Sequence, residues 1–228
     1  MKYTLVNPTL ETQIAEIERK IKLSMNGIVS DKMIQSGIHY KKNYGVSIHR
    51  IKEIAFLYTP GHELAQRLWD LQIRETMIMA TVLEPVESFH PDLAHKWAGS
   101  FNQIEIIEQA CMNLFSKLSY SNNLCLEWIH SDKVWIQVTG FLLAARIYTV
   151  LNQREINEII QGAIGYSITD NFHLYHAVSV CLIRFCRKDT MTATAILKEM
   201  IAISHSSYVG QQFISNEVKQ EILFLDII

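Results

Sequence analysis

The sequence predicts an all-α protein built from antiparallel helix pairs. Most of the chain places its apolar residues at the spacing of an amphipathic helix, and short polar joints separate these stretches. No stretch alternates apolar and polar residues between hairpin turns, as a β-hairpin would require. Loops of only a few residues favour antiparallel packing of consecutive helices.

Composition is that of a folded protein without an excess of positive charge. The 228 residues are 49% hydrophobic, which is enough to fill a sizeable core. Charged residues make up 19% of the chain, and the formal net charge is -2. Binding to nucleic acid would therefore depend on local clusters of basic residues.

The first predicted helix follows Asn7, which is a suitable N-cap, and Pro8, which suits a first turn. It is expected to end near Asn26-Gly27, where glycine can adopt a left-handed conformation. A shorter helix over residues 31–35 is expected to stop at Gly37.

Ser47 is expected to cap the next helix, after a turn at Tyr44-Gly45, and Pro60-Gly61 ends that helix. Its apolar residues share one face: Ile48, Ile51, Ile54 and Ala55. The same spacing predicts further helices over residues 62–72, 74–84, 92–101, 154–168, 171–189, 192–204 and 215–227.

Residues 102–151 are expected to organise the rest of the chain. From Val134 to Leu151 apolar residues occupy nearly every face of the helical repeat, which is typical of a helix covered on several sides. Ser131 is the expected N-cap of this helix, with Asp132 in its first turn.

A helix over residues 103–118 is expected to precede the buried one, and Glu108 falls inside its apolar stripe. An isolated buried carboxylate is costly, so Glu108 should reach a partner at the edge of the core or line a concave surface. The other members of the stripe are Ile104, Ile107, Cys111, Leu114, Phe115 and Leu118.

Successive helix pairs recur at intervals compatible with an α-solenoid of HEAT type. We expect a single HEAT-like domain over residues 1–228, because no linker or low-complexity run divides the chain. The concave face of such a stack is the usual place for a large ligand.

The N-terminus lacks the apolar core of a signal peptide, so we expect a cytoplasmic protein. No membrane contact is expected, because Gln137, Thr139 and Arg146 interrupt the longest apolar stretch. The cysteines have no CxxC spacing and are expected to be buried thiols: Cys111, Cys125, Cys181 and Cys186.

The segments NYGVSIHRIKEIA, IRETMIMATVLEP, FNQIEIIEQACMNLFSKL and EWIHSDKVWIQVTGFLLAARI resemble the DNA alkylation repair family of HEAT-like alkylpurine DNA glycosylases. The similarity extends from about Tyr40 to the region of Lys188. It implies a curved stack whose concave, basic face binds duplex DNA. It also implies cleavage of the N-glycosidic bond of N3- or N7-alkylated purines, without a cofactor.

The resemblance places Glu108 at the position of the family's catalytic acid. The tryptophan that accompanies this acid is replaced by Ile104. Neither Gln137 nor Val138 supplies the expected arginine, and Cys181 stands where a second aromatic residue is expected. The activity is therefore in doubt, and a non-enzymatic scaffold that binds a protein or undamaged or structured nucleic acid is the alternative.

Two basic clusters and one tryptophan are the candidate DNA-binding residues, because phosphates attract lysine and arginine whatever the base sequence. The alternative for both clusters is a solvated helix end. His173 and His176 lack the further ligands of a metal site, so no metal is expected. The candidates are Lys41, Lys42 and Arg50, then Trp135, and finally Arg184, Arg187 and Lys188.

Overall fold

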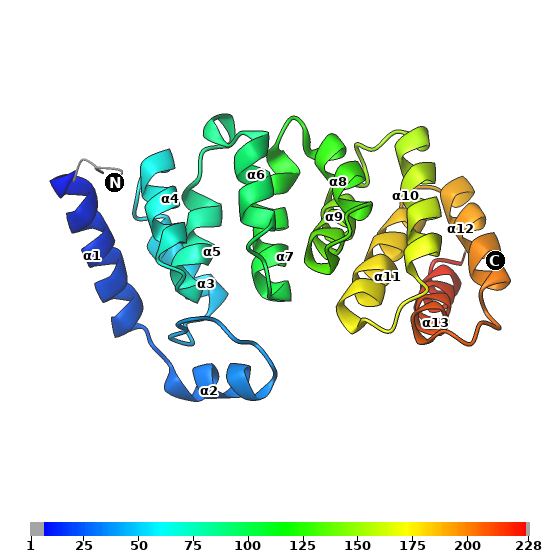
Figure 1. The fold of residues 1–228 in the computed structure, drawn as a ribbon, viewed down its shortest axis with the longest axis horizontal. Helices are drawn as coiled ribbons and strands as arrows, with labels where there is room; N and C mark the ends of the chain where they lie inside the picture. The colour runs from blue at the N-terminus through cyan, green and yellow to red at the C-terminus, as the bar shows by residue number, and fades with distance from the viewer. Residues whose placement is uncertain (1–6, 227–228) are drawn as a thin grey trace. The chain divides into compact units, whose positions relative to one another are not determined.

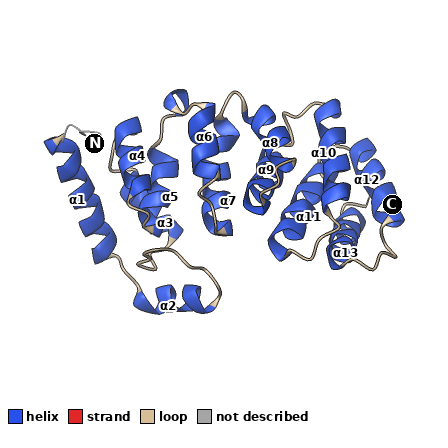
Figure 2. Ribbon diagram, in the orientation of Figure 1, coloured by secondary structure: helices blue, strands red, loops and turns tan. Residues whose placement is uncertain are grey.

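The computed structural model describes residues 7–226, and within that range every regular element is a helix (Figure 1, Figure 2). The all-α prediction is confirmed. The last residue of the final predicted helix, Ile227, lies outside the described residues. Contacts between residues divide the chain into an N-terminal unit, residues 1–90, and a C-terminal unit, residues 91–228. The expectation of a single domain stays a prediction.

The sequence predicted some of the helix caps of the N-terminal unit correctly. The side chains of Asn7 and Ser47 accept the expected backbone hydrogen bonds. The predicted role of Gly27 is wrong, because Gly27 starts the second helix and the Asn26 side chain caps it. The helices of this unit are α1 (Pro8–Leu23), α2 (Gly27–Gln35), α3 (Ile48–Ala55), α4 (His62–Asp70), α5 (Arg74–Leu83) and the 3₁₀ turn η1 (Val86–Ser88).

Two glycines shape the loop between α2 and α3. Gly37 has a φ of 81° and ends α2, as predicted, while Gly45 has a φ of 69°. Residues other than glycine rarely adopt positive φ angles of this size. A Cβ atom at Gly45 would also overlap the backbone oxygen of Asn26. The turn predicted at Tyr44-Gly45 therefore depends on glycine for two separate reasons.

A buried ion pair ties this loop to the start of α5. The Glu75 carboxylate is fully buried and accepts backbone hydrogen bonds of 3.2 Å from Tyr44 and Val46. Arg74 lies 3.0 Å from the same carboxylate and donates a 2.7 Å hydrogen bond to the Val46 oxygen. Both charges therefore have partners, which a buried charge requires.

Replacing Glu75 should destabilise the N-terminal unit. Glu75→Gln removes the buried negative charge that accepts hydrogen bonds from the loop backbone and from Arg74, so the free energy of unfolding should fall by about 3 kcal/mol. Glu63→Gln, at an exposed position of α4, should change it by less than about 0.5 kcal/mol. Urea unfolding followed by circular dichroism measures both. Equal losses in the two variants would contradict a structural role for the buried pair.

The C-terminal unit contains two layers of helices (Figure 1). In one layer α7, α9, α11 and α13 lie side by side, each in contact with the next, and α8, α10 and α12 pack against this layer. The bounds are α6 (Pro91–Ala98), α7 (Ile104–Asn113), the 3₁₀ turn η2 (Phe115–Lys117), α8 (Ser121–Ile129), α9 (Val134–Ile147), α10 (Gln153–Tyr166), α11 (Phe172–Cys186), α12 (Thr190–Ala202) and α13 (Val209–Phe224).

Helix α9 lies at the centre of this unit, as the sequence predicts. It packs against α7, α8 and α11, and most of its residues are buried. Both buried polar side chains of α9 form hydrogen bonds. Gln137 donates to the backbone oxygen of Ile129 on α8, and Thr139 donates to the backbone oxygen of Trp135 on α9 itself. None of the described helices combines the length and apolarity needed to cross a membrane.

The start of α9 differs from the prediction. Ser131 does not cap the helix; its hydroxyl accepts a 3.2 Å hydrogen bond from the backbone of Lys133, which is itself the N-cap residue. The preceding helix α7 is also shorter than predicted. It ends at Asn113, and the 3₁₀ turn η2 continues the chain.

A glycine allows α8 and α9 to approach closely. A Cβ atom at Gly140 would lie 2.7 Å from the backbone nitrogen of Ile129 and 2.9 Å from the carbonyl carbon of Trp128. Real Cβ atoms do not pack this tightly against backbone. Only glycine therefore permits this crossing.

Gly140→Ala should lower the free energy of unfolding by about 1–3 kcal/mol, because the added methyl group forces α8 and α9 apart. Gly165→Ala is the matched control, since a Cβ atom there meets no atom within 4 Å. Alanine favours helix, so this control should be neutral or more stable by up to about 1 kcal/mol. Thermal unfolding of both variants tests the difference, and similar behaviour of the two would contradict the close crossing.

All four cysteines are free and buried, which confirms the prediction. Burial raises the pKa of Cys125 to about 12, and that of Cys186 also to about 12, from an ordinary value of 9.0. Between about pH 9 and pH 12 these two thiols stay protonated in the folded protein, whereas the same thiols ionise in the unfolded chain.

The free energy of unfolding should therefore fall as the pH rises from about 9 toward 12. Urea unfolding at several alkaline pH values measures this dependence. Cys125→Ala should make it shallower by up to about 1.4 kcal/mol per pH unit, because one buried thiol is lost. An unchanged slope would show that Cys125 does not contribute.

Candidate functional site

Three charged residues lie at a regular interval on three neighbouring helices of the C-terminal unit. Glu108 is on α7, Arg146 on α9 and Arg184 on α11, and the two intervals between them in the sequence are equal. Because these helices lie side by side in one layer, the three side chains form a row across it. We call this set the charged row.

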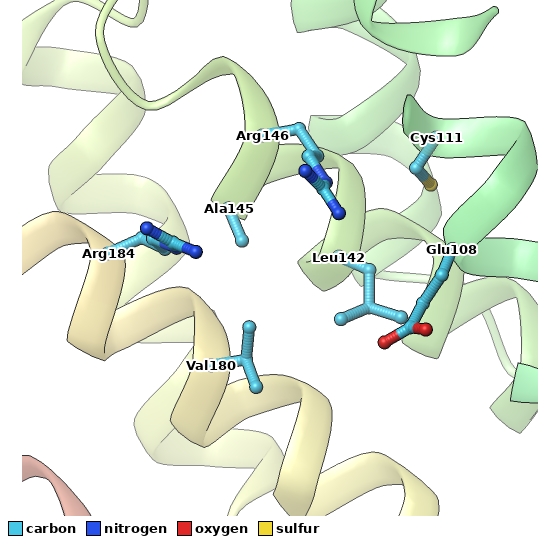
Figure 3. A pocket seen from close by; sticks show the side chains of 7 residues that line it. All are labelled: Glu108, Cys111, Leu142, Ala145, Arg146, Val180 and Arg184. Atoms are coloured by element: carbon cyan, nitrogen blue, oxygen red, sulfur yellow. The ribbon is translucent and has the colours of Figure 1, made fainter. Parts of the chain in front are cut away.

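The charged row surrounds a small hollow of about 50 Å³ (Figure 3). The Glu108 carboxylate and the two guanidinium groups lie around it, with the apolar side chains between them. These apolar residues are Cys111, Leu142, Ala145 and Val180. The site therefore presents one carboxylate and two guanidinium groups around an apolar surface.

The charged row is available to a ligand. Glu108, Arg146 and Arg184 are all exposed, and within residues 7–226 their side chains form no hydrogen bond or ion pair. The expectation that Glu108 belongs to the apolar stripe of its helix is wrong, because Ile107 and Cys111 are buried while Glu108 faces solvent. Of the two alternatives for this carboxylate, a partner at the edge of the core is not found among the described residues. The other alternative was that Glu108 lines a concave surface, and Glu108 is one of the residues that line the hollow.

The thiol at this hollow has a structural role. Cys111 is fully buried and lies 3.8 Å from the Thr139 backbone oxygen, to which its thiol donates. Burial raises the pKa of Cys111 well above its ordinary value. A thiol with a raised pKa is a poor nucleophile, which agrees with a structural role for Cys111.

The other two basic candidates on α11 and after it contact the protein itself. Arg187 lies 2.6 Å from the Glu221 carboxylate, and this hydrogen bond raises the pKa of Arg187. Lys188 donates to the backbone oxygens of Tyr148 and Leu151, just after α9. Arg184, the third basic residue of this cluster, is exposed and has no hydrogen-bond or ion-pair partner among the described residues. DNA contact by Arg184, Arg187 and Lys188 stays a prediction.

The basic cluster of the N-terminal unit lies on the loop before α3 and on α3. Lys41 and Lys42 are exposed, and the Lys42 ammonium lies 4.9 Å from the centre of the Tyr44 ring. Arg50 donates a 2.8 Å hydrogen bond to Glu53, which lowers the pKa of Glu53. DNA binding by Lys41, Lys42 and Arg50 also stays a prediction.

Trp135 differs from the other tryptophans. Trp69, Trp97 and Trp128 are buried, whereas Trp135 is half-buried at the start of α9 and packs against His173. DNA binding by Trp135 stays a prediction. Within residues 7–226, no three His, Cys, Asp or Glu side chains are grouped in a way that could hold a metal ion.

The sequence reasoning missed Arg146. The resemblance expects an arginine at Gln137 or Val138, but both residues are buried and neither lines the hollow. Arg146 lies about two helical turns further along α9 and was noted only as a break in an apolar stretch. Its position midway in the sequence between Glu108 and Arg184 is the signal that could have revealed it.

Comparisons with known proteins bear on the family and the fold. The model of a family described as DNA alkylation repair enzyme matches residues 18–206. One similar solved structure belongs to a new family of proteins related to the HEAT-like repeat DNA glycosylases with affinity for branched DNA structures. The match has a TM-score of 0.77 and 11% identity, and it covers 90% of this chain and 94% of that one. The predicted HEAT-like fold is confirmed. No curated protein sequence matches the chain.

Proposed function

The chain belongs to the DNA alkylation repair enzyme family, and on that premise we propose that its C-terminal unit binds DNA through the layer of α7, α9, α11 and α13. The charged row is the centre of the proposed interface. The observation that carries this proposal is the pair of exposed arginines, Arg146 and Arg184, at equivalent positions on adjacent helices beside Glu108.

Arg146 and Arg184 suit the DNA backbone. Guanidinium groups remain charged at any physiological pH and can donate two parallel hydrogen bonds to a phosphate. Helices packed side by side are about 8–10 Å apart, so the two arginines can contact separate phosphates of one strand. They would supply the cationic contacts that the resemblance expects at Gln137 or Val138.

Glu108 suits the chemistry of alkylpurine excision. An N3- or N7-alkylated purine carries a positive charge and leaves as a neutral base, while positive charge develops on the deoxyribose. A carboxylate near the sugar stabilises this charge and can position the attacking water. Leu142 and Val180 form an apolar surface beside Glu108 in the same hollow. The proposed reaction is hydrolysis of the N-glycosidic bond.

A DNA-binding protein without glycosylase activity is the second candidate. Ile104 and the fully buried Cys181 offer no aromatic face at the two positions where the resemblance expects one. The structural neighbour is described by its affinity for branched DNA, which supports including branched DNA among the ligands tested. In this candidate function Arg146 and Arg184 of the charged row bind phosphates, and Glu108 has no chemical role.

Removing the arginines should weaken DNA binding in a salt-dependent way. Arg146→Ala and Arg184→Ala should each lower affinity for duplex and four-way junction DNA and reduce the log-log salt slope by about 0.9, the value for one phosphate contact. Fluorescence anisotropy with labelled DNA measures both quantities. Arg154→Ala, which removes an exposed arginine from α10 in the other layer, should leave them unchanged. Equal effects of all three variants would contradict the proposed interface.

Glu108→Gln separates the two candidate functions. If the wild-type protein excises 7-methylguanine or 3-methyladenine from DNA, this nearly isosteric variant should reduce the rate by about 100- to 1000-fold, because the charge at the sugar is lost. Its DNA affinity should be equal or higher, since a carboxylate repels phosphate. Glu199→Gln on α12 is the charge-matched control. Wild-type binding without any excision would support the second candidate.

A further inference from the structure

Six rings gather at the N-terminal ends of α9, α11 and α13. Trp135 packs on His173 with ring centres 4.8 Å apart, and Phe172 stacks on His176 at 5.6 Å with an angle of 27° between the rings. Phe213 of α13 joins them through contacts with two rings of α11. We call this set the aromatic cluster: Trp135, Phe172, His173, Tyr175, His176 and Phe213.

The aromatic cluster lies at the surface. Phe172 is 55% exposed, and the other members are half-buried. The large aromatic side chains of the core, such as Trp128 and Phe141, are almost entirely covered. The cluster therefore leaves part of its ring surface open to a flat apolar ligand.

The aromatic cluster and the charged row share one face of the layer. Trp135 precedes Arg146 on α9 by the same interval in the sequence as His173 precedes Arg184 on α11. This interval is about three helical turns, which keeps each pair on one side of its helix. At 1.5 Å per residue, the two sets are about 16 Å apart along the helix axes.

We propose that the aromatic cluster binds an unpaired nucleobase from a single-stranded arm of branched DNA. This inference rests on the DNA binding proposed above and names the DNA structure that the C-terminal unit recognises. Bases in a duplex already stack on their neighbours, whereas an unpaired base has a free face that stacks on aromatic side chains. Because every base has such a face, the recognition is independent of base sequence.

The separation of the two sets fits a single DNA strand. A stacked strand rises about 3.4 Å per nucleotide, so about 16 Å corresponds to roughly five nucleotides. Phosphates of the paired region bind at Arg146 and Arg184, and a base about five nucleotides away reaches the aromatic cluster. A junction supplies paired and unpaired nucleotides at this distance, and an intact duplex does not.

The tryptophans allow direct observation of this contact. Trp69, Trp97 and Trp128 are buried, so quenching of fluorescence by a stacked base should report mainly on Trp135. A forked DNA with two oligo-dT arms should quench the fluorescence, and a blunt duplex with the same paired region should not. The Trp135→Leu protein should lose the quenching.

Binding measurements complete the test. Trp135→Leu and Phe172→Ala should each lower the affinity for forked DNA by about 5- to 100-fold, the range for loss of one stacked base. Phe172→Ala, at a residue outside the candidate DNA-binding set, should leave duplex affinity unchanged. Phe224→Ala is the control, because Phe224 is 80% exposed at the far end of α13 and outside the cluster. Circular dichroism confirms folding, and the exposed Phe172 provides a variant with little risk to the core.

Two results would overturn the inference: forked DNA that binds both variants as tightly as wild type, or an equal loss of affinity for duplex and forked DNA. Failure of the proposed function gives a different pattern. In that case Arg146→Ala and Arg184→Ala would leave duplex binding unchanged, whatever the Trp135 variant does.

Discussion

Close packing around α9 is the constraint on which the C-terminal unit depends. This helix is covered by α7, α8 and α11, and glycine at position 140 permits the backbone of α8 to approach it. The helix has almost no polar surface to expose, so its burial drives the assembly of both layers. The exposed end of α9, at Arg146, is then held in a fixed place between α7 and α11.

Equivalent positions on adjacent helices of the layer are separated by a constant interval in the sequence, and so charged residues at that interval form a row across the layer. The interval between the starts of α9 and α11 also separates Arg146 from Arg184, and Trp135 from His173. Residues with this separation therefore take the same place on the two adjacent helices. One face carries an aromatic cluster near the start of its helices and a charged row further along them.

Basic residues of this protein divide into two groups by their surroundings. Arg74, Arg187 and Lys188 neutralise carboxylates or cap carbonyl groups of the protein itself, and so they hold loops and helix ends in place. Arg146 and Arg184 lie on an exposed face without such partners among the described residues. A charge committed to a protein partner binds DNA only at the expense of that contact, which is why the second group is the better candidate for phosphates.

The sequence by itself determined the helical class, the buried position of α9, and the caps at Asn7 and Ser47. Each of these depends on local spacing or on a short-range hydrogen bond, which a sequence displays directly. The candidate role of Glu108 came from the family resemblance and not from its spacing. Only the tertiary structure decided that Glu108 is exposed, that Arg146 lies beside it, and that Glu75 is buried under the loop before α3. These features depend on how helices far apart in the chain pack together, and helical periodicity does not specify that packing.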